Sequence, residues 1–268
     1  MRAYTYRIYV PDGNDTALVL GLADNSVERA KINDAIQKKH SNVEQVGFLS
    51  EDNLNPQLVM AGGEFCGNAA RTAVWHYLKG LPGELSIAVS GAENQLKAGI
   101  TDSLQVWTQM PVDKNLGNIK TVADGFHLVP LDGITHIVVD PVQAAAFIKN
   151  GEEGLKISAK NILTDNHLLD CPAAGVIFLE NTVDDIKIHP CVYVSGINTM
   201  FYESACGSGT VAVGLVMCLK QENDVNVSLI QPSNKTIRTI IKRQGFFVTE
   251  AIISGGVTTD GVIYNIRS

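Results

Sequence analysis

The sequence predicts an α/β protein built from two similar halves. Two observations support this prediction. Strand-like and helix-like runs follow one another in the same order twice along the 268 residues, and a short Cys-Gly segment occurs once in each half. Residues 112–120 are the most linker-like stretch. We therefore expect an N-terminal domain at residues 1–115 and a C-terminal domain at 116–257, with a last strand at 258–268 that can return to the first domain.

The first half is predicted as strands with two helices between them. Residues 27–39 carry apolar side chains at helical spacing, and a second helix over residues 66–79 ends at Gly80 and Pro82. Runs of alternating or continuous apolar residues predict strands at 4–10, 16–22, 45–49, 57–60, 85–89, 96–100 and 104–110. A Pro-Asp-Gly-Asn turn closes the first strand at residues 11–14.

The second half repeats this scheme. One helix is predicted near residues 142–149, and an apolar helix follows a Gly-rich turn at about 206–220. The strands are predicted at 126–130, 134–139, 175–179, 186–194, 199–203, 227–230, 236–241, 245–253 and 262–266.

Composition narrows the function classes. A net charge of −7 argues against a nucleic-acid partner, because phosphate binding needs a basic face. No apolar run suits a signal peptide or a membrane-spanning helix, so we expect a cytoplasmic protein without membrane contact. The five cysteines include no Cys-x-x-Cys pair, and the histidines show no metal-binding spacing. We therefore predict neither a disulfide framework nor a metal site.

The repeated Cys-Gly segment carries the functional prediction. Residues 63–70 read GEFCGNAA and residues 203–210 read ESACGSGT, which places Cys66 and Cys206 140 residues apart. Glu64 and Glu203 precede the two cysteines, and each segment opens an apolar helix. A single Cys-Gly at a helix start is more often structural than catalytic. Two such segments in register favour a function.

A helix start is a chemically specific place for a thiol. Its first N–H groups lack intrahelical partners, and the helix dipole adds positive charge there. We therefore expect lowered thiol pKa values and N–H groups that can bind a carboxylate. Two such ends can invert a stereocentre, because one cysteine removes the α-proton while the other delivers a proton to the opposite face. The pattern predicts an amino-acid racemase or epimerase with Cys66 and Cys206 as its acid and base.

The segment Cys-Gly-Asn-Ala-Ala-Arg at Cys66, the Ala-Cys-Gly-Ser-Gly at Cys206 and the Gly-Asn-Asp at residues 13–15 resemble signatures of the diaminopimelate epimerase superfamily. The similarity spans nearly the whole chain. It implies two pseudo-symmetric domains, each a curved mixed sheet wrapped around a central helix. It also implies catalysis without pyridoxal phosphate, metal or another cofactor, and a homodimer. The site residues implied for the α-carboxylate are the amides of Gly67, Asn68, Gly207 and Ser208, with a further contact from Asn14.

Within that superfamily, the chain resembles most the histidine racemases of opine-metallophore (staphylopine-type) biosynthesis, at residues 44–48, 58–60, 64–69 and 203–210. That resemblance implies that Glu44 and Gln45 lie in the substrate pocket, with Met60 in its wall. Glu64 or Glu203 would accept the α-ammonium. We expect a small-molecule amino-acid substrate, histidine above others.

Two alternatives stay open. Diaminopimelate epimerases have an Asn where this chain has Met60, a Gly-Asn-Pro-His where it has residues 133–136, and an Arg before the second cysteine that is missing here. These groups hold the far end of diaminopimelate, so their loss disfavours that substrate. Isomerases or binding proteins of the phenazine-biosynthesis type lack the cysteine pair. We assign no role to any of the six histidines, because none has a companion at catalytic spacing.

Overall fold

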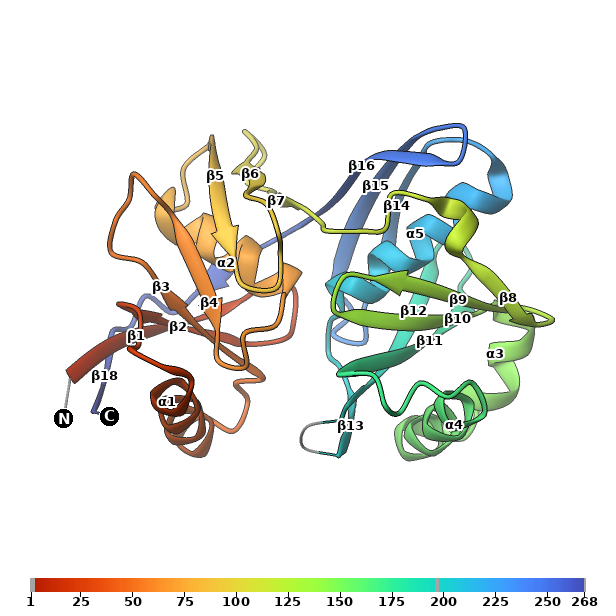
Figure 1. The fold of residues 1–268 in the computed structure, drawn as a ribbon, viewed down its shortest axis with the longest axis horizontal. Coiled ribbons are helices and arrows are strands. Elements are labelled where there is room, and N and C mark those ends of the chain that lie inside the picture. Colours follow the sequence, from red (N-terminus) through yellow and green to blue (C-terminus); the bar gives the residue numbers. More distant parts are fainter. Residues whose placement is uncertain (1–2, 196–197, 268) are drawn as a thin grey trace. The chain divides into compact units, whose positions relative to one another are not determined.

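The structure is a computed structural model that describes residues 3–195 and 198–267. The chain forms two compact units (Figure 1). Unit 1 consists of Met1–Gln109 together with the C-terminal segment Ser254–Ser268, and unit 2 of Met110–Ile253. The boundary at Gln109 and Met110 lies close to the division that we expected at residues 115 and 116.

Unit 1 is a mixed sheet with two helices. Strand β1 pairs antiparallel with β2 on one side and with β17 and β18 on the other. From β2 the sheet continues through β3 (parallel), β4 (antiparallel), β5 (parallel), β6 and β7 (both antiparallel). The elements are β1 Ala3–Val10, β2 Thr16–Leu20, α1 Ser26–Lys39, β3 Gln45–Leu49, β4 Gln57–Met60, α2 Gly67–Tyr77, β5 Gly83–Val89, β6 Leu96–Ile100, β7 Val106–Gln109, β17 Thr258–Thr259 and β18 Tyr264–Arg267.

Within the described residues, unit 2 has the same plan and also nine strands, but it has three α-helices and a short 3-10 helix where unit 1 has two α-helices. Strand β10 pairs antiparallel with β9 and parallel with β11, and β12 pairs antiparallel with β11 and parallel with β14. The elements are the short helix η1 Leu116–Asn118, β8 Lys120–Ala123, β9 Phe126–Leu131, β10 Ile134–Val139, α3 Pro141–Ile148, α4 Gly151–Asp165, β11 Ala173–Asn181, β12 Ile186–Val194, β13 Thr199–Tyr202, α5 Gly207–Gln221, β14 Val225–Ile230, β15 Thr236–Gln244 and β16 Phe247–Gly255, whose end crosses into unit 1.

The strand directions show that the fold is duplicated. In unit 1 the order β1, β2, β3, β4, β5, β6 has pairings that alternate antiparallel and parallel, and β9, β10, β11, β12, β14, β15 repeat that alternation in unit 2. Helix α2 lies in sequence between β4 and β5, and α5 lies between β12 and β14. The predicted α/β class with two pseudo-symmetric halves is confirmed.

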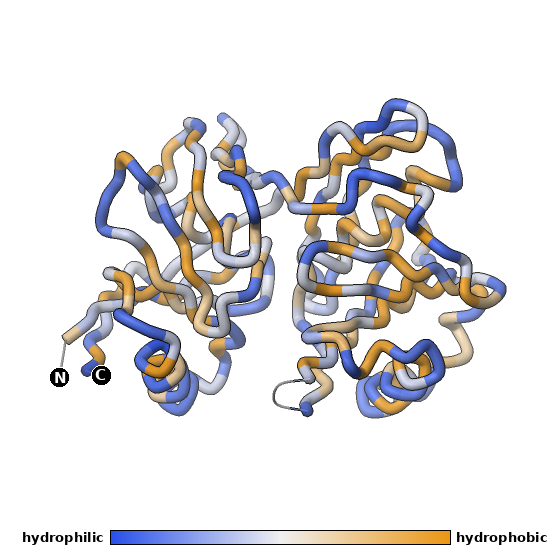
Figure 2. Tube along the Cα trace, in the orientation of Figure 1, coloured by the Kyte–Doolittle hydropathy of each residue, from blue (hydrophilic) through white to orange (hydrophobic). Residues whose placement is uncertain are grey.

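Each unit folds around one of these two helices. Helix α2 contacts β2, β3, β5, β6 and β7, whereas α5 contacts β9, β10, β11, β14 and β15. Nearly every residue of α5 from Gly207 to Cys218 is buried. Figure 2 shows the contrast with α1, which is mostly hydrophilic and covers one side of unit 1. The central helices therefore hold their N-terminal residues against the interior of the sheet that surrounds them.

Helix α4 was absent from the sequence prediction. Its buried side chains are Leu155, Ala159 and Leu163, which recur every four residues on one narrow stripe. Glycines at 151 and 154 and a mostly polar surface weaken the helical signal in this stretch. The stripe packs against β11, β12 and β13. Tertiary contacts therefore stabilise a helix that local helix propensity does not predict.

Candidate functional site

Cys66 is the N-cap residue of α2. Its backbone is extended (φ −136°, ψ 115°), and its Sγ accepts a hydrogen bond from the Ala69 N–H at 3.4 Å. The first intrahelical bond runs from Ala70 N to Cys66 O at 2.9 Å. The amides of Gly67 and Asn68 therefore precede the helical hydrogen-bond ladder, which is the position from which backbone N–H groups bind an anion.

Gln45 is the side-chain partner of this thiol. The Cys66 Sγ–H donates to Gln45 Oε1 at 2.7 Å, and Gln45 stands at the first position of β3. The preceding residue, Glu44, accepts from Asn14 Nδ2 at 3.1 Å. The structure thus brings Asn14, Glu44, Gln45 and Cys66 together in unit 1, although 52 residues of sequence separate the first from the last.

Two other predicted residues of unit 1 lie in different surroundings. Met60 is 1% exposed and belongs to the hydrophobic core of the unit, so packing alone accounts for it. Glu64 is exposed, and its carboxylate folds back toward Gly62. Gln45, whose Oε1 accepts from the thiol, is therefore a side-chain partner of Cys66.

Cys206 occupies the matching place in unit 2, as the N-cap residue of α5. Its Sγ accepts from the Gly209 N–H at 3.2 Å, and its side chain is hydrogen-bonded to the carboxylate of Glu203. The amides of Gly207 and Ser208 precede the first intrahelical bond, from Thr210 N to Cys206 O. Of the two glutamates in the repeated segment, Glu203 lies beside its cysteine and Glu64 does not.

The expected lowering of the thiol pKa is wrong for Cys206. The residue is 3% exposed, and this burial raises the pKa of its thiol well above the usual value. The negative charge of Glu203 raises the pKa further, while hydrogen bonds from Ser208 and Gly209 lower it. Desolvation and an adjacent carboxylate together outweigh the helix N-terminus. Cys206 is therefore held as the protonated thiol.

A buried glutamine fixes the backbone at Cys206. Gln231 follows β14 directly and is fully buried, and its Oε1 accepts from the Cys206 N–H at 2.9 Å. Its Nε2 donates to Thr210 Oγ1 at 3.2 Å and to the Leu229 carbonyl at 3.1 Å. In unit 1, Ser90 follows β5 and has the matching task, since its Oγ donates to the Glu64 carbonyl at 2.8 Å.

His136 is a neighbour of this site that the sequence prediction left out. It lies in β10, and its Nε2 is 2.9 Å from Ser208 Oγ, which in turn is 3.5 Å from Cys206 Sγ. Burial lowers the pKa of His136 to about 4. The contact joins residues 72 positions apart, so spacing along the sequence could not reveal it.

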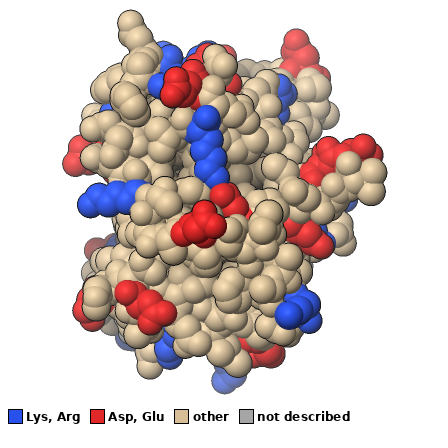
Figure 3. Space-filling view, turned by 90° about the vertical axis from the view of Figure 1, so that its right-hand side faces the viewer, with Lys and Arg blue, Asp and Glu red and all other residues tan. Residues whose placement is uncertain are grey.

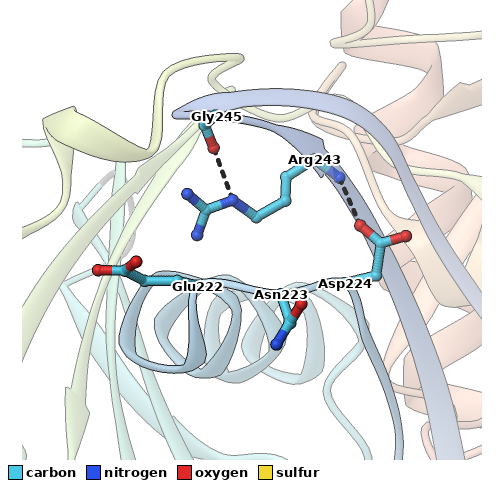
Figure 4. A pocket seen from close by; sticks show the side chains of 5 residues that line it. All are labelled: Glu222, Asn223, Asp224, Arg243 and Gly245. Atoms are coloured by element: carbon cyan, nitrogen blue, oxygen red, sulfur yellow. Dashed lines mark hydrogen bonds between the residues drawn. The ribbon is translucent and has the colours of Figure 1, made fainter.

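A polar pocket at the end of α5 opposite to Cys206 is formed around Arg243, whose Nε donates to Gly245 O and whose backbone N–H donates to Asp224 (Figure 4). Figure 3 shows Lys and Arg side chains interspersed with Asp and Glu on one face of the molecule.

Within residues 3–195 and 198–267, His, Cys, Asp and Glu side chains form no group of three or more that could hold a metal ion. No helix in the same ranges combines the length and the apolar character that crossing a membrane requires.

Comparison with known proteins gives consistent matches. The family model described as "Histidine racemase CntK N-terminal domain" matches residues 5–264. A histidine racemase of Fusobacterium nucleatum subsp. nucleatum is 28% identical over 277 residues, covering 95% of this chain and 94% of its own.

Solved structures share the fold. A phenazine biosynthesis protein of the PhzF family from Enterococcus faecalis has a TM-score of 0.63 at 14% identity, with 100% of each chain covered. A hydroxyproline epimerase from Agrobacterium vitis, solved with bound trans-4-hydroxy-L-proline, has a TM-score of 0.64 at 11% identity, covering 99% of this chain and 92% of its own.

Proposed function

The chain belongs to the histidine racemase family whose model spans residues 5–264, and from this premise we propose that it inverts the α-carbon of histidine with two cysteines as acid and base. Its relatives identify it as an isomerase of the racemase or epimerase class. The observation that carries the finer proposal is the equivalent placement of Cys66 and Cys206, each the N-cap of the central helix of one duplicated unit.

In the proposed reaction one proton leaves the α-carbon and one proton is added to its opposite face. One cysteine, as thiolate, takes the α-proton, and the electrons of the C–H bond remain on the α-carbon. The other cysteine, as thiol, gives its proton to the opposite face of that carbon. After one turnover the two cysteines have exchanged protonation states, and the reverse reaction uses them in opposite roles. The state of Cys206 as a thiol beside Glu203 supports its role as the proton donor, and Cys66, whose thiol donates to Gln45, must lose its proton before it takes the α-proton.

The α-carboxylate has four backbone donors in this proposal. They are the amides of Gly67 and Asn68 at the start of α2 and of Gly207 and Ser208 at the start of α5. Helix N-termini bind carboxylates through these N–H groups and through the dipole. Negative charge that develops next to the carboxylate during proton removal is stabilised by the same donors. We assign the α-ammonium to Glu203, the carboxylate that lies beside a cysteine.

The polar pair at the start of β3 supports histidine as the substrate. Glu44 and Gln45 carry carboxylate and amide groups that can hydrogen-bond an imidazole, and Asn14 holds Glu44 in place at 3.1 Å. A second carboxylate, as in diaminopimelate, would need a cation. The sequence places no Arg or Lys in residues 203–210. The fold likeness to phenazine-biosynthesis proteins is independent of the two cysteines and favours no second function.

The decisive experiment screens L-amino acids in heavy water and reads α-deuterium by mass spectrometry and enantiomer ratio by chiral chromatography. We expect L-histidine to turn over fastest. A site built on hydrogen bonds to one polar side chain rejects analogues that lack it by about 10⁴-fold. L-Leucine is the matched control without a polar side chain. Faster epimerisation of L,L-diaminopimelate than of histidine would overturn the substrate assignment.

The family resemblance also supports four properties of the protein in its cell. We propose that it acts as a homodimer in the cytoplasm, without pyridoxal phosphate or metal, and that it supplies D-histidine for an opine metallophore. Sedimentation of the full chain tests the dimer, and a purely monomeric active enzyme would contradict it. Full activity after dialysis against a chelator and treatment with hydroxylamine is expected if no metal or pyridoxal phosphate takes part.

A further inference from the structure

A line of three polar atoms connects β10 with the start of α5. It runs from His136 Nε2 to Ser208 Oγ over 2.9 Å and from Ser208 Oγ to Cys206 Sγ over 3.5 Å. His136 is fully buried and Cys206 is 3% exposed. All three residues belong to unit 2. The direction in which hydrogen atoms point along this line decides which form of the thiol it favours.

The surroundings of His136 select one tautomer. The ring is neutral at physiological pH because burial lowers its pKa to about 4, so it carries a single N–H. In the described part of the chain, Nδ1 is buried and has no hydrogen-bond partner. It lies against Gly175, where a Cβ would come within 2.4 Å of Nδ1. A buried N–H without an acceptor is rarer and more costly than an unused acceptor. The hydrogen therefore belongs on Nε2.

This tautomer dictates the orientation of the serine hydroxyl. With the hydrogen on Nε2, His136 donates and Ser208 Oγ accepts. A hydroxyl has one hydrogen, and the histidine cannot take it in this arrangement. The neighbouring acceptor is Cys206 Sγ at 3.5 Å. The Ser208 hydrogen is consequently directed at the sulfur, where it stabilises a thiolate more than a thiol.

We propose that His136 is a positioning residue that acts through Ser208 to aim a hydroxyl hydrogen at Cys206 and so makes the thiolate of this cysteine accessible during turnover. Burial and the Glu203 carboxylate oppose that thiolate, and Gly209 N–H and Ser208 favour it. Cys206 must lose its proton once in each turnover of the two-cysteine reaction. This inference rests on the proposed function, because it gives Cys206 a role in proton transfer.

The first test reads the tautomer directly and needs no substitution. In ¹⁵N-labelled protein, the Nδ1 and Nε2 shifts of His136 report which nitrogen carries the hydrogen. We expect the Nε2–H form from pH 6 to pH 8. An Nδ1–H form would overturn the proposal, since Ser208 would then donate to the histidine instead of the cysteine.

The second test measures the pH dependence of Cys206 alkylation by iodoacetamide, read on the Cys206 peptide by mass spectrometry. Ser208→Ala removes the hydroxyl, and we expect the pH midpoint of Cys206 alkylation to rise by about one pH unit. His136→Leu should also raise this midpoint. His136→Gln keeps a side-chain N–H donor, and its midpoint should stay near that of the wild type. The charged group that faces Cys206 is Glu203, which all these variants retain.

Controls separate the line of contacts from general damage to the unit. His127→Gln changes another buried histidine of unit 2, bonded to Asp140 and Thr121, and should leave the Cys206 midpoint unchanged. The double variant Ser208→Ala/His136→Leu should shift the midpoint no further than Ser208→Ala alone. An additive shift, or unchanged midpoints in both single variants, would overturn the proposal.

The outcome is separable from failure of the proposed function. If Cys206→Ala retained wild-type racemisation, the two-cysteine mechanism would fail, while the tautomer and the alkylation profile would still report on the contact. If Cys206→Ala is inactive and the His136 variants retain the wild-type kcat and its pH profile, the positioning role alone is refuted. We expect kcat of His136→Leu to fall by about tenfold, with recovery in His136→Gln.

Discussion

Arg71 Nη1 lies 3.1 Å from Asp12 Oδ2, and the arginine side chain is fully buried. Its Nη2 donates to Asn68 Oδ1 at 2.9 Å. Asp12 belongs to the turn that closes β1, where Asp12, Gly13 and Asn14 all have positive φ angles of 63°, 121° and 50°. Because non-glycine residues rarely adopt such angles, the turn needs external support. Arg71 supplies it, and in doing so holds both Asn14 and Asn68, two of the proposed substrate contacts.

Removal of the Arg71 charge should therefore damage stability and substrate binding together. Arg71→Met removes the buried cation that lies beside the largely shielded Asp12 carboxylate, and we expect a loss of about 3–5 kcal/mol in the free energy of unfolding. Asp12→Asn leaves the fully buried Arg71 guanidinium without its carboxylate counter-ion and should cost a similar amount. Urea unfolding and KM for histidine are the measurements. Lys156→Met, which removes a surface ion pair with Glu153, is the matched control and should cost under about 1 kcal/mol.

How far the sequence predicts such a site depends on whether the signal is local. Cys66 and Cys206 could be located at helix starts because N-cap, glycine and apolar helix adjoin in the sequence. Gln231 and His136 could not be found from the sequence. Gln231 follows the end of β14 and His136 lies in β10, and both are distant in sequence from the Cys206 segment that they contact. The sign of the Cys206 pKa shift was missed because burial and the position of the Glu203 carboxylate are properties of the packed unit.

Substitution of either cysteine should stop racemisation without stopping all exchange. Cys66→Ala and Cys206→Ala each retain one of the two proposed catalytic thiols. That thiol can still exchange the α-proton on one face with retention of configuration. Proton NMR of L-histidine in heavy water measures α-exchange, and chiral chromatography measures D-histidine. We expect no D-histidine from either variant. Cys171→Ala, a half-buried cysteine of unit 2, should match wild type. Near-normal racemisation by both single variants would refute the mechanism.

Gln45 should matter for catalysis more than for folding. Its Oε1 accepts from Cys66 Sγ at 2.7 Å, so Gln45→Ala removes the side-chain partner of this thiol. This is a neutral hydrogen bond that orients the thiol, and a bond of that kind corresponds to about 2- to 10-fold in rate. We expect kcat/KM for histidine to fall in that range. Gln37→Ala removes a nearby half-buried amide that bonds the Glu44 carbonyl and Asn33, and it should leave kcat/KM unchanged. Equal losses in both variants would argue against a specific role for Gln45.

Two histidines, the fully buried His136 and the partly buried His76, predict how stability changes with pH. Burial lowers the pKa of His136 to about 4, and burial with a smaller contribution from Arg7 lowers that of His76 to about 4 as well. Both side chains are held neutral in the fold, where His76 Nδ1 bonds Tyr9 Oη at 2.8 Å. In the unfolded chain they titrate near the usual value of about 6.5. The unfolded state therefore binds more protons between these two pKa values, and acid favours unfolding.

The stability from these groups is fully present above pH of about 6.5 and is lost as the pH falls toward about 4. Between pH 7.5 and 5, each histidine should lower the free energy of unfolding by about 2 kcal/mol. Urea unfolding at half-unit steps over this range measures the loss, above the range in which carboxylates titrate. His76→Gln keeps a polar partner for Tyr9 and should remove the contribution of His76 to the pH dependence of the unfolding free energy. His136→Gln should remove the contribution of His136. A double variant with the wild-type slope would show that neither histidine is kept neutral by the fold.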